Sequence, residues 1–118
     1  MMNVFLSYAS RDAKKLQKVL DQLISRGILS SQDKVIDTSA IAVPGSSMRG
    51  QVREAIENAS KFVVVLNDTA LTSEWVNYET GMADALGKPI LVVVPKGETS
   101  RVPRNLKETE IIEMEEIK

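Results

Sequence analysis

Residues 62–66 read Phe-Val-Val-Val-Leu, and residues 90–94 read Ile-Leu-Val-Val-Val. Both runs are unbroken and rich in β-branched side chains, whereas a strand with one wet face would alternate apolar and polar residues. Burial on both faces is typical of parallel strands that lie between two layers of helices. The two runs therefore predict the centre of a parallel sheet.

Shorter apolar segments at residues 4–6, 35–36 and 111–112 predict three further strands. Helical segments lie between most of the strands, and this alternation is the order of βαβ units, whose crossovers are nearly always right-handed. We therefore expect an α/β fold with a flavodoxin-like, doubly wound sheet of about five parallel strands and helices on both faces. Residues 1–118 are expected to form this single domain, either alone or as one domain of a longer protein.

Three helices are expected where apolar residues recur every three or four positions. The first follows Ser10 as its N-cap and ends at Gly27 as its C-cap. The second carries its apolar stripe over residues 48–59. The third covers residues 73–86 and is stopped by the Gly-Lys-Pro sequence that follows it.

The composition argues against several classes of function. The formal net charge is -1 and no dense run of Lys or Arg occurs, so nothing favours binding to nucleic acid or to an acidic membrane. The chain has no cysteine and no histidine, which removes Ser-His and Cys-His nucleophiles and the usual zinc ligands, and we expect no metal site. No signal peptide is visible, and the longest apolar stretch, residues 89–95, is far short of the ~20 residues of a membrane span. These features favour the cytoplasm.

Four loops are expected to meet at the carboxyl edge of the sheet, where open parallel sheets bind ligands. They cover residues 7–10, 37–47, 67–73 and 95–103. The second loop is long for a connection in an α/β protein. Its length indicates a functional loop, and a surface insertion without a role is the alternative.

Glu79 interrupts the apolar stripe of the third expected helix. The other members of the stripe are Trp75, Met82 and Leu86, and the spacing of four, three and four keeps all four residues on one face. Burying an unpaired carboxylate costs several kcal/mol, so a charge at this position needs an explanation.

Two interpretations of Glu79 are open. The structural one places the carboxylate at the rim, paired with a Lys or Arg such as Arg11 or Arg53. The functional one places it near the crevice beside Trp75, whose flat face offers a surface for a ring. Trp75 alone is more typical of a core residue than of a ligand platform, so the argument rests on the two residues together.

Motifs in four places resemble those of Toll/interleukin-1 receptor (TIR) domains. Residues 4–10, Val-Phe-Leu-Ser-Tyr-Ala-Ser, are similar to the first box of the family, and residues 43–45, Val-Pro-Gly, resemble its BB loop. Residues 73–79, Ser-Glu-Trp-Val-Asn-Tyr-Glu, resemble its Ser-x-x-Trp-x-x-x-Glu motif, although Ser and Trp are two apart here. Lys-Pro-Ile at residues 88–90 also agrees. The resemblance spans nearly the whole chain and points to the bacterial-type, NAD-cleaving branch.

This resemblance implies an enzyme, an NAD+ nucleosidase or cyclase that cleaves the bond between nicotinamide and ribose and yields ADP-ribose or a cyclic isomer. Glu79 corresponds to the catalytic glutamate of the family, and NAD+ is then a substrate, with no resident cofactor expected. The implied substrate-binding residues are Tyr8, Ala9, Ser10, Arg11, Ser73 and Trp75.

The resemblance also implies partners. The loop formed by Val43, Pro44 and Gly45 is expected to act in self-association, because the active site of the family is commonly completed by a neighbouring subunit. Activation by oligomerisation in immune or antiviral defence, with an effector or sensor domain or protein as a further partner, follows from the same resemblance.

Three other functions compete with this one. A non-catalytic TIR module would use the same loops for protein–protein contacts in signalling, and Glu79 beside Trp75 argues against it because such modules often lack the glutamate. A nucleoside deoxyribosyltransferase also places a glutamate against a sugar. A response-regulator receiver is rejected, because Ser7 and Tyr8 stand where it needs acidic metal ligands, which leaves Asp68 without companions.

Overall fold

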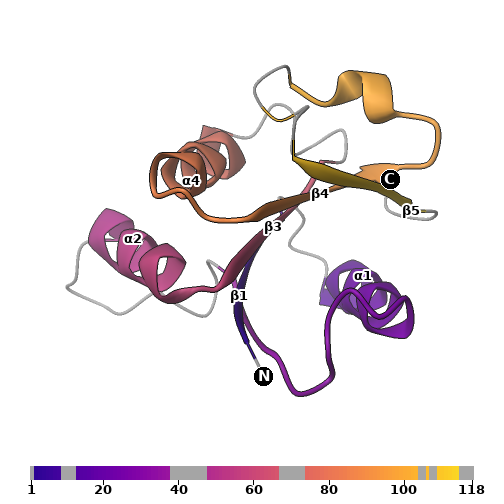
Figure 1. Cartoon of the computed structure of the whole chain (residues 1–118), viewed down its shortest axis with the longest axis horizontal. Coiled ribbons are helices and arrows are strands. Elements are labelled where there is room, and N and C mark those ends of the chain that lie inside the picture. The colour runs from indigo at the N-terminus through magenta and orange to yellow at the C-terminus, as the bar shows by residue number, and fades with distance from the viewer. Residues whose placement is uncertain are drawn as a thin grey trace.

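The computed structural model describes residues 2–8, 13–37, 48–66, 74–103, 106 and 109–114. All five predicted strands are present in this part of the chain, together with the three predicted helices and a short 3-10 turn (Figure 1). In chain order the elements are β1 (Asn3–Ser7), α1 (Ala13–Ser25), β2 (Lys34–Ile36), α2 (Met48–Asn58), β3 (Lys61–Val65), α4 (Glu74–Ala85), β4 (Ile90–Pro95), η2 (Thr99–Arg101) and β5 (Glu110–Met114).

The sheet is parallel throughout, in the order β2-β1-β3-β4-β5. Helices α2 and α4 cover one face and α1 covers the other (Figure 1). This is the flavodoxin-like, doubly wound arrangement, so the predicted fold class is confirmed. From β1 the chain first builds outward to β2 and then returns to build β3, β4 and β5 on the opposite side. The strand order therefore reverses between β1 and β3.

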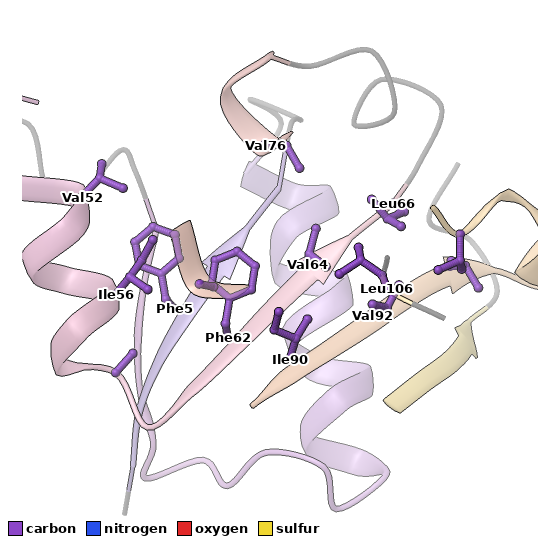
Figure 2. Close-up of a cluster of buried hydrophobic side chains, with 14 residues drawn as sticks. Phe5, Val52, Ile56, Phe62, Val64, Leu66, Val76, Ile90, Val92 and Leu106 are labelled. Atoms are coloured by element: carbon purple, nitrogen blue, oxygen red, sulfur yellow. The ribbon is translucent and has the colours of Figure 1, made fainter. Parts of the chain in front are cut away.

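Side-chain alternation along the strands divides the core into two layers. Val4 and Leu6 belong to the cluster beneath α1, whereas Phe5 belongs to the cluster beneath α2 and α4. The rings of Phe5 and Phe62 stack with centroids 5.6 Å apart and 6° between their planes. In Figure 2 these two rings lie beside Ile56 of α2. Both faces of the central strands are thus buried, which explains their unbroken apolar sequences.

Helices α1 and α4 end where the sequence predicts. Gly27 and Gly87 adopt φ angles of 75° and 67°, the left-handed conformation that glycine adopts without strain. After α4, the Lys88 N–H donates to the Ala83 carbonyl at 3.0 Å, the long-range bond of a Schellman cap. Within the described residues, every helix falls short of the length and hydropathy needed to cross a membrane.

Candidate active site

The buried face of α4 is rotated slightly from the predicted stripe. Its buried members are Val76, Glu79, Thr80 and Ala83. The other predicted members are half-buried and flank this face: Trp75, Met82 and Leu86. The spacing of the sequence is compatible with two adjacent helix faces, and packing against the sheet selects the one centred between residues 76 and 83. Glu79 lies on the buried face in either phase.

Glu79 is an acid inside an otherwise apolar layer. It is 1% exposed, and its neighbours Val76 and Ala83 on the buried face of α4 belong to the apolar cluster between helices and sheet. Desolvating a carboxylate costs several kcal/mol even after the protein relaxes around it. The fold tolerates this cost, so the site must provide hydrogen bonds for the carboxylate.

Ser7 provides one of these hydrogen bonds. Its hydroxyl donates to Oε1 of Glu79 with an oxygen–oxygen distance of 2.7 Å, a usual distance for an O–H···O hydrogen bond. Ser7 is the last residue of β1 and pairs in register with Val64 of β3. Two residues after Phe5, it points to the same face of the sheet as Phe5, toward α2 and α4. The Ser7–Glu79 pair therefore lies at the carboxyl end of β1, where the strand order reverses.

The rim position of the structural interpretation is wrong, because the Glu79 side chain is buried, whereas its pairing with a cation such as Arg11 stays a prediction. Arg53, one of the two cations named for that interpretation, instead forms an exposed ion pair with Glu57, with Nε and Oε1 2.8 Å apart. The other, Arg11, lies outside the described residues. The position of Glu79 is therefore that of a buried acid near the ligand-binding edge typical of open parallel sheets.

Trp75 lies one turn before Glu79, in the same layer. The indole is half-buried and stacks on Tyr78 with ring centroids 5.4 Å apart and 25° between the planes. From α2, the guanidinium carbon of Arg49 lies 5.7 Å from the centroid of the Tyr78 ring, within cation–π range. Trp75 thus contributes to core packing, as one interpretation had it, and keeps part of its surface exposed beside the acid.

Tyr8 follows Ser7 but packs on the opposite face of the sheet. Its half-buried ring joins the cluster beneath α1, together with Leu6 two residues earlier. The alternation of a strand continues through this residue, so Ser7 and Tyr8 point to different layers. The structure therefore brings Trp75 and Glu79 into one layer and places the Tyr8 ring in the other.

The remaining predicted site residues lie outside the described part of the chain. They are Ala9, Ser10, Arg11, Val43, Pro44, Gly45 and Ser73. Their roles stay predictions. In the described part, no group of three or more acidic side chains is placed to hold a metal ion.

A hollow of about 590 Å³ lies elsewhere, between α1 and the edge strand β5. Its lining residues are Gln22, Arg26, Lys96, Ile111, Ile112, Glu113 and Met114. Neither Ser7 nor Glu79 borders it. The candidate site is thus identified by its chemistry and by its place in the sheet, and this hollow is a separate feature.

Ser7 is the functional candidate that sequence reasoning missed. It stands inside the first box, and a single serine at a strand end carries no signal of its own. Its role becomes visible from two observations together, namely that it shares a face with Phe5 and that α4 covers this face. Alternation along β1 could have separated Ser7 from Tyr8, had the helix on each face been known.

A model of the TIR domain family matches residues 4–116, almost the whole chain. The protein belongs to the TIR domain family, as the motifs predicted. No curated protein sequence matches the chain.

Solved structures agree with this fold. The TIR domain of the Toll-related receptor TRR-2 from Hydra magnipapillata superimposes with a TM-score of 0.67 at 18% identity, over 94% of this chain and 84% of that one. The CMP N-glycosidase BcmB from Clostridium botulinum gives 0.60 at 18% identity, over 98% and 90%. The TIR domains of the activated Roq1 resistosome give 0.62 at 21% identity, over 86% of this chain and 62% of that one. At these identities the likeness concerns the fold.

Proposed function

We propose that this TIR domain cleaves the N-glycosidic bond between nicotinamide and ribose in NAD+, releasing nicotinamide and ADP-ribose or a cyclic isomer. The observation that carries the proposal is the buried Glu79 carboxylate, which accepts a hydrogen bond from Ser7 where the strand order reverses. A charge in an apolar layer is costly, and functional sites are where such costs are commonly retained.

The chemistry suits a chain without histidine. Cleavage of an N-glycosidic bond builds positive charge on the ribose, as in the oxocarbenium-like transition state of glycoside hydrolysis. A carboxylate held in a dry site stabilises that charge more strongly than one in water. The nicotinamide ring is cationic while it is bonded to the ribose and becomes neutral when it leaves. No strong general acid is therefore needed. We assign the carboxylate of Glu79 to this charge and a wall of the pocket to Trp75.

The comparison with a CMP N-glycosidase supports this proposal at the level of the fold. That enzyme, by its name, also acts on an N-glycosidic bond of a nucleotide. An N-glycosidase is therefore already known on a backbone of this shape. Its name also supplies an alternative substrate, CMP, for the assay below.

Self-association is part of the proposal. The resistosome neighbour is an assembly that contains TIR domains, and we propose that this chain likewise associates with itself, through the loop at Val43, Pro44 and Gly45. The first-loop residues Ala9, Ser10 and Arg11, with Tyr8 and Ser73, are proposed to contact substrate. A cytoplasmic role in immune or antiviral defence signalling, with an effector or sensor as partner, completes the proposal.

The test is nicotinamide release from NAD+, with the products identified by mass spectrometry. The domain is assayed alone and fused to an oligomerising coiled coil, because association is expected to raise the rate. Glu79→Ala and Glu79→Gln should lower kcat at least about 100-fold, as expected for loss of a group that stabilises transition-state charge. Asp84→Asn, which removes an exposed carboxylate from the same helix, is the matched control and should retain activity.

A non-catalytic interaction module is the second candidate. The burial of Glu79 favours it, because a carboxylate bonded to Ser7 also connects α4 to β1. Such a structural role would explain the buried acid without catalysis. If the clustered protein shows no Glu79-dependent turnover of NAD+, the role as an interaction module remains. Parallel reactions with CMP and with a nucleoside plus a free base identify a nucleotide glycosidase or a deoxyribosyltransferase instead.

A further inference from the structure

Ser7 and Glu79 meet across the fold although they stand 72 positions apart in the sequence. Ser7 is 0% exposed and Glu79 is 1% exposed, so their hydrogen bond is shielded from water. A hydrogen bond in such surroundings is stronger than the same bond at the surface, because water does not compete for either partner. The contact is therefore suited to holding the carboxylate in one orientation.

A glutamate side chain has three torsions, and an unrestrained carboxylate samples several rotamers. Oε1 of Glu79 is held 2.7 Å from a hydroxyl that itself belongs to a central strand. Ser7 has a short side chain on a backbone that pairs with Val64 of β3, so the donor has little freedom to move. The carboxylate thus acquires the rigidity of the sheet, although its own backbone belongs to a helix.

We infer that Ser7 is a positioning residue, which orients the Glu79 carboxylate toward the ribose whose positive charge it stabilises; this inference rests on the proposed function. Because Ser7 is fully buried and bonded to Glu79, it acts through Glu79 rather than on the substrate itself. Catalysis by a charged group depends strongly on its placement, because a displacement of about 1 Å can cost about 100-fold in rate. Support of this kind behind an acting group is what keeps such a placement accurate.

A purely structural role makes a different prediction. If the hydrogen bond only ties β1 to α4, its loss should lower stability and leave the rate of the folded protein unchanged. Thr80 provides the matched comparison. It is the next residue on α4 and it is buried. Its hydroxyl donates to the Val76 carbonyl at 2.8 Å, a bond in which Glu79 takes no part. Thr80→Val therefore removes a buried hydroxyl from the same helix and leaves the Ser7–Glu79 pair in place.

The experiment measures kcat and KM for NAD+ on the clustered protein. The variants are Ser7→Ala, Ser7→Thr, Ser7→Cys and Thr80→Val, each shown to be folded by urea unfolding. Ser7→Ala should lower kcat about 10-fold or more with little change in KM, since it affects the transition state and not substrate binding. Ser7→Thr, which keeps the hydroxyl, should retain most of kcat. Ser7→Cys, a weaker donor of similar size, should fall between them and serves if the threonine does not fit.

Each outcome decides between the hypotheses. Wild-type turnover together with an unchanged kcat in Ser7→Ala overturns the positioning role and leaves the proposed function standing. An equal loss of kcat in Ser7→Ala and Thr80→Val also overturns it, because the effect would then be one of general stability. A wild-type protein with no Glu79-dependent turnover refutes the proposed function, and the positioning role falls with it.

Discussion

Replacing both members of the Ser7–Glu79 pair with apolar residues should not destabilise the protein. The proposed variant is the double substitution Ser7→Ala and Glu79→Met, in which methionine has a volume close to that of glutamate. The carboxylate lies in a layer whose other members are almost all apolar, between helix α4 and the sheet. If the acid is retained for chemistry, its burial costs stability that an apolar side chain would recover.

The expected free energies follow from the geometry of the pair. Ser7→Ala alone leaves the buried carboxylate without a donor at 2.7 Å, and the loss of a hydrogen bond to a charged group should cost about 1.5–3 kcal/mol. Removing both members of this hydrogen bond leaves neither of these two groups unsatisfied, so the double variant should equal the wild type or exceed it by up to about 4 kcal/mol. For 118 residues the unfolding entropy is about 0.25 kcal/mol/K, so each kcal/mol moves Tm by about 4 °C.

The measurement is urea unfolding at pH 7, followed by tryptophan fluorescence. Trp75 is the only tryptophan of the chain, and it lies on α4 one turn from residue 79, so it reports on the element that is changed. Asp84→Asn, at an exposed position of the same helix, should stay within about 0.5 kcal/mol of the wild type. A double variant less stable than the wild type by more than about 2 kcal/mol refutes the reasoning. The carboxylate would then be part of what holds the fold together.

Three further predictions concern stability, and urea unfolding checks each of them. Leu23→Ala should cost about 2–5 kcal/mol because Leu23 is fully buried on α1, whereas Ile24→Ala, one residue along at 37% exposure, should cost far less; similar losses would contradict the assigned face. Gly81→Ala should stabilise α4 by about 0.5–1 kcal/mol, since its Cβ meets open space, and Gly87→Ala should destabilise it because φ there is 67°; equal signs would contradict the cap. Backbone N–H donors hold the pKa of Asp33 below its ordinary value of 3.8. The wild type should therefore be more stable than Asp33→Asn well above pH 3.8, and this difference in unfolding free energy should vanish as the pH falls below that value through the folded pKa. A pH-independent difference contradicts this.

The sheet could be predicted from the sequence because its signals are local. An unbroken β-branched run has few alternatives to a strand covered on both faces, and glycine after an apolar stripe has few alternatives to a helix cap. The runs at 62–66 and 90–94 became β3 and β4, and Gly27 and Gly87 ended their helices as expected. Even the weak segments at 35–36 and 111–112 formed strands, since a parallel sheet supplies partners for them.

The site was less predictable because it depends on which faces meet. The periodicity of α4 identified Glu79 as an acid on a buried face, but it placed Trp75 at the centre of that face instead of its edge. The resemblance named Tyr8 among the pocket residues; the alternation of β1 places its ring in the layer opposite Ser7, and its contact with substrate stays a prediction. No local pattern names the partner of a buried acid that lies 72 residues away.

The position of β1 between β2 and β3 also has a consequence for folding during translation. Strand β1 is translated first, and its second neighbour, β3, is translated much later. Helix α4, which carries Glu79, the partner of Ser7, follows after β3. At about 5–20 residues per second, the 72 positions between them take about 4–14 s to translate. Until β3 has been translated, the nascent chain holds an apolar strand without one of its two neighbours. The candidate site therefore cannot assemble before α4 has been translated, because Glu79 lies on that helix.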